Sequence, residues 1–438
     1  MAVRAPSVLA SLLAVVMMLA MVRVKVSHLA ALLSAAMLTV SASQIRYAQE
    51  VREYSLSVLF AAILIFCFLR WETERTRRGH PALLYAALFI APFIQYGLVL
   101  FAFVILTTIG LLVWFSRDTC FRWSHAVIAS SFFGAGGLLS FFLTVRCQAA
   151  QRQDQSYLAA NYFDPMTMSL LGFVSTNSRA LLSFLISGRV MALCFAIGAI
   201  IYCIAQARAR KYERVTLLVF TSVLITLCAS LARVYPYGGV RQCLYLAPVV
   251  TLFAGVVFAD LLQRLKGFLR PVAMLGFITF IFLSGYRVMR SASPYQEIED
   301  TRNVLEKVAR SSAPNDRVYV YWAAVPAVDF YSRGTDHRFI YGKFHRGAPQ
   351  EYVPELLASI EGQTDRIWLV FSHFQLSSAS TMNRSEQQLI VDSLRSAWDV
   401  QPVVTATGAA LYVAHRRTSP APGLAQPQPL NHSGSHAT

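Results

Sequence analysis

The residues best suited to chemistry in this chain lie in two short polar stretches between apolar runs. The first extends from Ser43 to Ser55 and combines two arginines, two glutamates and two tyrosines, namely Arg46, Tyr47, Glu50, Arg52, Glu53 and Tyr54. If this stretch is helical, Glu50 is an i,i+4 neighbour of both Arg46 and Tyr54. A buried carboxylate there would need a cationic partner. The alternative interpretation is a solvated turn with local ion pairs.

The second polar stretch runs from Arg233 to Tyr245, and its arginines and tyrosines are Arg233, Tyr235, Tyr237, Arg241 and Tyr245. Arginine presents a planar fork of donors that binds two phosphate oxygens at once. Arginines with aromatic residues beside a bilayer therefore suit a phosphate group that carries a lipid tail. The alternative is an aromatic belt with arginines that snorkel to the membrane surface.

The elements that position these stretches are membrane helices. Of the 438 residues, 55% are hydrophobic and 14% are charged, whereas an ordinary soluble protein has roughly 25% charged residues. Mean hydropathy is +0.48. The net charge is +16. In a membrane protein such an excess of positive charge usually lies in the cytoplasmic loops, so no nucleic-acid partner is needed to explain it.

The apolar runs predict a polytopic helical bundle of about ten spans, because a membrane helix needs about 20 mostly apolar residues. Pro92 to Gly97 interrupt the run 81–115, which predicts two helices there. The stretch 166–186 contains the polar run 175–179 and is interpreted as an interfacial helix. The predicted spans are 7–22, 28–43, 54–70, 81–95, 98–115, 125–145, 187–207, 215–231, 243–262 and 270–287.

Positive charge sets the expected orientation of the bundle. One set of alternate loops (23–27, 71–80, 116–124, 208–214 and 264–270) carries fourteen Lys and Arg residues, and the other set (44–53, 146–165 and 232–242) carries six. The richer set is cytoplasmic by the positive-inside rule. Both polar stretches, both termini and everything after residue 288 are then expected outside.

Residues 1–22 have a signal peptide as their alternative interpretation, because a short basic start precedes an apolar run. No convincing small-residue cleavage site follows, and Arg23 and Lys25 lead into a second apolar run. A first spanning helix is therefore favoured.

The seven cysteines show no zinc-binding spacing and are interpreted as helix-packing residues. Cys147 and Cys243 share the outer side in this topology. That placement permits a disulfide between them, but nothing in the sequence favours one.

Acidic residues are absent from the central part of every predicted span. Proton- and sodium-coupled transporters usually need ionisable groups inside the membrane. This absence argues against a coupled transporter. Arg189 is the one charge whose place in a span is unexpected, and it lies close to an outer end from which it can snorkel.

The composition changes near residue 291, where a small α/β domain is predicted to begin. Helices are expected at 296–312, 325–332, 350–361 and 385–397, and strands at 317–322, 338–344, 366–371, 399–406 and 409–415, the last two antiparallel. The strands 317–322 and 366–371 are apolar on both faces and are expected side by side at the centre of the sheet. The predicted domains are a membrane domain at 1–290, this outer domain at 291–417, and a disordered tail at 418–438.

Several segments also resemble a known family. They are RAPSVLASLLAVVMMLAMV (Arg4–Val22), SASQIRYAQEVREYSL (Ser41–Leu56), RQCLYLAPVVTLFAG (Arg241–Gly255), VYVYWAAVPAVDFY (Val318–Tyr331) and RIWLVFSHF (Arg366–Phe374). They are similar to integral-membrane C-type glycosyltransferases (family 39-like), in particular to the bacterial branch with the rhizobial lipopolysaccharide glycosyltransferases and the protein O-mannosyltransferases. In that family the loop that corresponds to Ser41–Leu56 typically reads S-P-x-x-x-x-Y-S-Q-E-A-R-x-Y-S, and a later helix begins R-x-x-x-Y/L-x-x-P.

The resemblance implies an enzyme of the bacterial inner membrane. It would move a sugar from a polyprenyl-phosphate donor to an acceptor hydroxyl on the outer side. Arginines or a divalent metal ion would stabilise the leaving phosphate. Glu50, Arg52 and Tyr54 match the Glu, Arg and Tyr of the loop pattern and are assigned to the catalytic site. Arg241 matches the later arginine and is assigned to the donor phosphate, and the other expected substrate-binding residues are Arg46, Tyr47, Arg233, Tyr235 and Tyr237.

One feature of the family has no counterpart here. The family places a catalytic Asp in an acidic outer loop after its first spanning helix, but this chain begins at what resembles the second helix. The expectation is a misassigned start, a fragment or an inactive relative. The alternatives to an enzyme are a non-enzymatic membrane protein with a partner-binding outer domain, and a lipid-linked flippase or transporter. The acceptor, the sugar and the oligomeric state stay open.

Overall fold

The structure, a computed structural model, divides into two compact units, Met1–Ser293 and Pro294–Thr438. It describes residues 4–24, 26–50, 52–73, 80–115, 123–145, 156–186, 189–208, 214–292, 300–332, 338–343, 351–360, 365–372, 386–406 and 408–417. The tail 418–438, predicted to be disordered, lies outside the described residues, as does Cys147.

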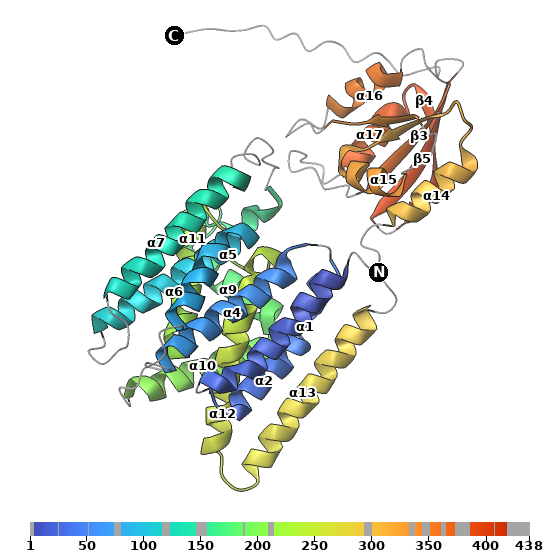
Figure 1. The fold of residues 1–438 in the computed structure, drawn as a ribbon. Helices are drawn as coiled ribbons and strands as arrows, with labels where there is room; N and C mark the ends of the chain where they lie inside the picture. The colour runs from blue at the N-terminus through green and yellow to red at the C-terminus, as the bar shows by residue number, and fades with distance from the viewer. Residues whose placement is uncertain are drawn as a thin grey trace, which may run out of the picture. The chain divides into compact units, whose positions relative to one another are not determined.

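The first unit is a helical bundle (Figure 1). Its elements are α1 (Ala5–Ala20), η2 (Met21–Val24), α2 (His28–Thr39), α3 (Ala42–Ala48), α4 (Tyr54–Thr73), α5 (His80–Ile94), α6 (Tyr96–Phe115), α7 (Trp123–Ser140), η3 (Phe141–Val145), η5 (Ser156–Asn161), α9 (Leu170–Ile186), α10 (Arg189–Arg208), α11 (Arg214–Leu231), η6 (Arg241–Leu246), α12 (Ala247–Arg264) and α13 (Leu269–Ala292).

Every predicted span coincides with an apolar helix, but not every helix is long enough to cross a membrane. Within the described residues, seven helices meet that length and composition, or eight if the bent pair α2 and α3 counts as one span. The apolar parts Pro81–Ile94 of α5 and Phe195–Gln206 of α10 are shorter. The prediction of a polytopic helical bundle is confirmed, with fewer full-length spans than ten.

The predicted span 28–43 is broken because a serine starts a new helix inside it. Ser41 has an extended backbone, and its side chain accepts a hydrogen bond from the amide of Gln44, as an N-cap residue does. The two helices meet at an angle of 58°. This bend turns α3, which carries Arg46 and Tyr47, away from the axis of α2.

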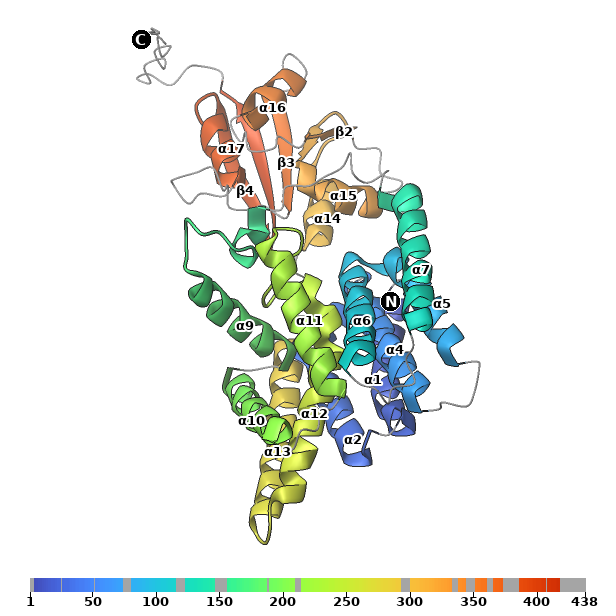
Figure 2. The same cartoon turned by 90° about the vertical axis from the view of Figure 1, so that its left-hand side faces the viewer.

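Two other sequence expectations are resolved in this unit. Gln95 alone separates α5 from α6, so the prediction of two helices within 81–115 is confirmed. The polar run 175–179 lies inside the continuous helix α9, whose buried residues recur at helical spacing as Phe173, Asn177, Leu181 and Leu185. The stretch is therefore helical despite its serines and asparagine, and Figure 2 shows α9 inclined to α11.

Close packing within the bundle depends on small residues. A Cβ atom at Gly255 would lie 2.1 Å from Ser34 Oγ and 2.4 Å from the carbonyl oxygen of Ala30. Only glycine lets α12 and α2 approach this closely, which is the usual way in which membrane helices gain packing contacts.

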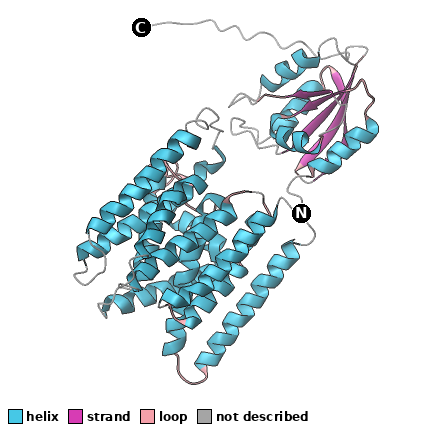
Figure 3. Ribbon diagram, in the orientation of Figure 1, coloured by secondary structure: helices cyan, strands magenta, loops and turns pink. Residues whose placement is uncertain are grey.

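The second unit is a five-stranded sheet with helices on both faces, as Figure 3 shows. The strands are β1 (Arg317–Val320), β2 (Arg338–Tyr341), β3 (Arg366–Ser372), β4 (Trp398–Ala406) and β5 (Ala409–Arg416), in the order β2-β1-β3-β5-β4. β1 pairs in parallel with both β2 and β3, and β5 is antiparallel to β3 and β4. The predicted neighbours β1 and β3 are confirmed, as is the antiparallel last pair.

Alternate residues of β1 explain why the unit has two cores. Tyr319 belongs to a cluster with α16 (Tyr352–Ile360) and α17 (Glu386–Leu394). Val318 and Val320 belong to a second cluster with α14 (Thr301–Ser311) and α15 (Val325–Tyr331). Successive side chains of a strand point to opposite faces, so a strand buried on both faces must be apolar throughout.

A buried ion pair fixes the start of β1 to β3. Asp316 is 7% exposed and accepts hydrogen bonds from Arg366 at 2.6 Å, from Trp368 Nε1 at 2.9 Å and from the Ala313 amide at 2.8 Å. Burial by itself would raise the pKa of Asp316. The hydrogen bonds from Arg366, Trp368 and the Ala313 amide outweigh that effect, and the pKa is lowered.

We expect Asp316→Asn to destabilise this unit by about 2 kcal/mol, because it removes a buried charged acceptor that several donors share. A carboxyl pKa lowered by folding contributes stability above its unfolded value of about 3.9, and this contribution is lost as pH falls through the folded pKa. The difference between the variant and the parent should therefore shrink toward acid pH. The full chain is treated with protease at rising temperature, and the measurement is the temperature at which cleavage within β3 begins. Asp392→Asn, at an exposed ion pair, is the control, and equal shifts for both variants would contradict the assignment.

Candidate active site at one end of the membrane unit

The segment that carries the first polar stretch is anchored at its helical end. The hydroxyl of Ser43, in the first turn of α3, donates to the carbonyl oxygen of Phe184 in α9 at 2.8 Å. α3 ends at Ala48, a short turn follows, and α4 begins at Tyr54. Glu50 therefore lies in a turn, and the single helix that would have made Arg46, Glu50 and Tyr54 neighbours does not form.

The two polar stretches meet at an arginine and two tyrosines. The rings of Tyr47 and Tyr54 lie edge to face with centroids 5.3 Å apart. Arg241 of η6 places its guanidinium carbon 5.7 Å from the centre of the Tyr54 ring, within the range of a cation–π contact. Arg46 lies 5.8 Å from the centre of the Tyr47 ring. Residues about 190 positions apart in the chain thus form one group, which we call the Arg–Tyr cluster (Arg46, Tyr47, Tyr54 and Arg241).

Glu50 and Arg52 lie beside the Arg–Tyr cluster. Arg52 Nε is 3.9 Å from Glu50 Oε2, and the two side chains are 43% and 21% exposed. The Arg52 side chain also hydrogen-bonds Tyr54, and the charges of Glu50, Arg52 and Arg241 all act on the Tyr47 hydroxyl. A partly exposed carboxylate, more than one guanidinium group and two phenol hydroxyls are therefore gathered at one end of the bundle.

Tyr235 connects the cluster to the rest of η6. Its hydroxyl donates to the carbonyl oxygen of Gln242 at 2.7 Å, and its ring lies 6.1 Å from that of Tyr245. Burial raises the pKa of Tyr235 well above its ordinary value, and the neighbouring Tyr245, Cys243 and Tyr54 add to the effect. Tyr235 therefore remains a neutral hydroxyl at any physiological pH.

The described side-chain contacts of Tyr237 and Arg233 are with residues outside the Arg–Tyr cluster. The Tyr237 hydroxyl lies 2.7 Å from Ser178 Oγ of α9, and burial raises its pKa. Arg233 donates to the carbonyl oxygen of Phe163 at 3.2 Å and pairs with Asp164 at 3.3 Å. Both partners of Arg233 belong to the segment after η5, so its described contacts are not with the Arg–Tyr cluster.

The described residues at this end of the bundle contain neither a disulfide nor a group that could hold a metal ion. Cys243 is a free, buried thiol that donates to the carbonyl oxygen of Pro236, and its suggested partner Cys147 lies outside the described residues. No group of three or more His, Cys, Asp and Glu residues that could hold a metal ion occurs in the part of the chain that the structure describes.

Some polar groups near this end were not anticipated from the sequence. Ser55, next to Tyr54, is fully buried, and its hydroxyl has no hydrogen-bond partner within the described residues. Asn161 and Asn177 hydrogen-bond to each other, and Asn161 also bonds the main chain of Tyr237. The sequence did contain a signal for Asn177, because a lone amide on the buried face of an amphipathic helix needs hydrogen-bond partners.

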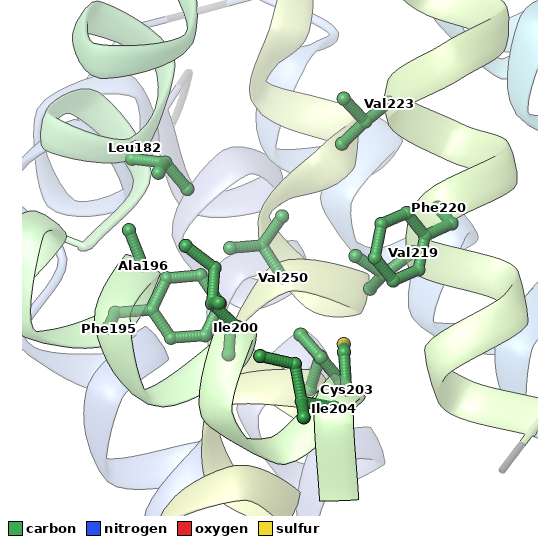
Figure 4. A pocket seen from close by; sticks show the side chains of 12 residues that line it. Leu182, Phe195, Ala196, Ile200, Cys203, Ile204, Val219, Phe220, Val223 and Val250 are labelled. Carbon is green, nitrogen blue, oxygen red and sulfur yellow. The ribbon is translucent and has the colours of Figure 1, made fainter. Parts of the chain in front are cut away.

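An apolar cavity of about 370 Å³ opens between α10, α11 and α12, with Leu182 of α9 at its margin (Figure 4). Ile200, Ile204 and Phe220 at its edge are between 49% and 60% exposed, so the cavity opens to the outside of the bundle. Val250 and Phe253 form its floor and belong to α12, the helix that follows Arg241. A cavity lined by aliphatic and aromatic side chains suits a hydrocarbon chain.

We expect Gly97→Ala to disturb the tyrosines beside the cluster, because a Cβ atom there would lie 2.7 Å from the Tyr235 hydroxyl and 2.5 Å from the Tyr245 ring. Overpacking of this kind costs about 1–3 kcal/mol. Gly110→Ala, on the same helix with nothing within 4 Å of the added atom, is the control and should be neutral or stabilising. Thermal unfolding in detergent measures both variants, and equal behaviour would show that the contact is not tight.

Comparison with known proteins places this geometry in context. Residues 5–121 match the family described as the protein O-mannosyl-transferase TMEM260 N-terminal domain. No curated protein matches the chain by sequence.

Solved structures match over most of the chain. ArnT from Cupriavidus metallidurans, in the apo state and bound to undecaprenyl phosphate, matches with a TM-score of 0.53 and 12% identity, over 94% of this chain and 83% of that one. The oligosaccharyltransferase AglB from Archaeoglobus fulgidus, in complex with an inhibitory peptide and a dolichol-phosphate, matches with a TM-score of 0.50 and 10% identity. That match covers 82% of this chain and 57% of AglB.

These proteins are C-type glycosyltransferases, so the resemblance indicated by the sequence motifs is confirmed at the level of the fold. The chain is an integral membrane protein with the C-type glycosyltransferase fold.

Proposed function

We propose that the chain is a membrane glycosyltransferase that uses a polyprenyl-phosphate-linked sugar as donor, with the Arg–Tyr cluster as the donor-phosphate site. The observation that carries the proposal is the contact of Arg241 with Tyr54, with Arg52 and Glu50 beside it. A protein with few charges has concentrated guanidinium groups at the end of a membrane bundle, where a lipid phosphate would lie. The fold shared with ArnT and AglB supports the same assignment.

The distance along α12 supports a lipid-linked donor. Arg241 and Val250 are nine residues apart, and a helical rise of 1.5–2.0 Å per residue separates them by roughly 15 Å. A phosphate at Arg241 and a hydrocarbon chain in the apolar cavity would therefore belong to one elongated molecule. Because the arginine and the apolar cavity lie along one candidate span, Arg241–Arg264, a lipid phosphate is favoured over a free sugar phosphate as the donor.

The reaction we propose is a direct displacement at the sugar. The acceptor hydroxyl attacks C1 of the sugar, a new C1–O bond forms, and the bond from C1 to the phosphate oxygen breaks. The proton of the acceptor passes to a carboxylate, for which Glu50 is the candidate held at the cluster by Arg52. The leaving phosphate gains negative charge, which Arg241 stabilises because its guanidinium is already fixed over Tyr54.

We also propose that this end of the bundle faces outward, in the inner membrane of a bacterium. Arg241 and Arg264 stand at opposite ends of one candidate span, and the basic loops 208–214 and 264–270 mark the cytoplasmic end. The match to a protein O-mannosyl-transferase domain makes mannose the first sugar to test, and a protein hydroxyl the first acceptor.

We expect Arg241→Ala and Glu50→Gln each to lower sugar transfer by about 100-fold, because each removes a group that acts on the transition state. The assay is transfer from undecaprenyl-phosphate mannose in membranes that contain the chain, with other polyprenyl-phosphate sugars in parallel. Arg264→Ala, at the other end of the same span, is the matched control and should retain the parent rate. Normal transfer by both site variants in folded protein would refute the assigned roles.

A second prediction concerns the apolar cavity. Ala199→Phe should fill part of it and weaken binding of undecaprenyl phosphate by roughly fivefold, with a smaller effect on a short-chain polyprenyl phosphate. Ala273→Phe on α13, a helix that does not line the cavity, is the control. Lipid binding to the purified chain in detergent measures the effect. Equal losses for the long and the short lipid would mean that the hydrocarbon chain lies elsewhere.

A further inference from the structure

The helix α9 is fastened to both halves of the candidate site. At its C-terminal end, the carbonyl oxygens of Phe184 and Leu185 accept hydrogen bonds from Ser43 Oγ at 2.8 Å and Ser41 Oγ at 3.3 Å. The Phe184 ring also lies 6.2 Å from the ring of Tyr47. This end of α9 therefore holds the segment that carries Tyr47.

The middle of α9 holds the other half through a group that we call the α9 clamp (Asn161, Asn177 and Ser178). Ser178 Oγ lies 2.7 Å from the Tyr237 hydroxyl. Asn177 Oδ1 accepts from Asn161 Nδ2 at 3.3 Å. Asn161 in turn bonds the main chain of Tyr237 twice, because its carbonyl accepts from the Tyr237 amide at 2.9 Å and its Nδ2 donates to the Tyr237 carbonyl at 3.4 Å.

The two amide side chains of the clamp constrain each other. Asn177 is 5% exposed, and its Nδ2 donates to the carbonyl oxygens of Ala160 and Phe173. A buried amide left without partners is costly, so each of these bonds constrains the others. Gly238 has a φ of +144°, and a Cβ atom there would lie 2.6 Å from an amide atom of each asparagine. The turn after Tyr237 is thus pressed directly onto the clamp.

A displacement of this turn would be transmitted to Arg241. The turn is closed on itself by the bond from the Tyr235 hydroxyl to Gln242 O at 2.7 Å and by the bond from Cys243 Sγ to Pro236 O at 3.2 Å. Tyr237 and Arg241 both lie within the segment that these two bonds close, and Arg241 follows Tyr237 by four residues. The described bonds from the clamp to this turn go to Tyr237, so the clamp reaches Arg241 through the turn.

We propose that Asn161, Asn177 and Ser178 are positioning residues that hold Arg241 at its distance from Tyr54 and thereby set the affinity for the donor phosphate. This inference rests on the proposed function of the Arg–Tyr cluster. It gives α9, a short helix beside the bundle, the task of fixing the spacing between two site segments that come from distant parts of the chain.

The test compares Asn177→Ala with Ser175→Ala, a substitution on the exposed face of the same helix. Two measurements are made on the purified full chain in detergent, namely the affinity for undecaprenyl phosphate and amide hydrogen exchange over residues 235–243 without lipid. Asn177→Ala should weaken lipid binding about tenfold and speed exchange in 235–243, and Ser175→Ala should change neither. Ser178→Ala, which removes only the hydroxyl contact, serves if Asn177→Ala does not fold.

A double-mutant cycle separates positioning from general destabilisation. If the clamp acts through Arg241, Asn177→Ala should add nothing to the loss caused by Arg241→Ala, because the two changes remove one interaction. Additive losses, or unchanged exchange over 235–243, would overturn the inference. If Arg241→Ala leaves lipid affinity unchanged, the proposed function fails instead. In that case, amide hydrogen exchange over residues 235–243 is the measurement that tests whether the clamp holds the turn.

Discussion

The stacking of Arg241 against Tyr54 is the contact on which the arrangement of this end of the molecule depends. A guanidinium group at the end of an apolar bundle cannot be left without compensation, because a charge away from water is costly. The ring face of Tyr54 supplies part of that compensation here. A guanidinium group at this position suits a phosphate, which is the kind of group that a lipid carrier would bring to the membrane surface.

The remainder of the membrane unit can be understood as the support for this contact. The two polar segments are far apart in sequence, and neither forms a long helix of its own around the cluster. Each is instead tied to α9, the first by the hydroxyl of Ser43 and the second by the hydroxyl of Ser178 and, through Asn161, by the amide of Asn177. Polar side chains bonded to main-chain carbonyls are well suited to this task, because in an apolar environment such bonds have few competitors.

The second unit follows a different logic. The parallel strands β1 and β3 are buried on both faces. Their position in the sequence is indicated by the change from a helical apolar pattern to a continuous one. Asp316 and Arg366 add a charged connection between the starts of β1 and β3. The cores on the two faces are separate clusters, so the sheet itself is what unites them. Its shape is thus set by strand pairing, and the helices cover it.

The sequence by itself determined the membrane helices, the strand and helix order of the second unit, and the residue types of the site. These features depend on local hydrophobicity and periodicity, which a chain displays without folding. The meeting of Tyr54 with Arg241 was anticipated from a resemblance and from charge, but the exclusion of Arg233 from that group was not. Arg233 bonds Phe163 and Asp164, and no local pattern encodes which partner a long side chain will reach. The break at Ser41 and the role of Asn177 were likewise decided by tertiary structure. A serine or asparagine in an apolar helix is ambiguous until its hydrogen-bond partner is in place, such as Leu185 for Ser41 and Asn161 for Asn177.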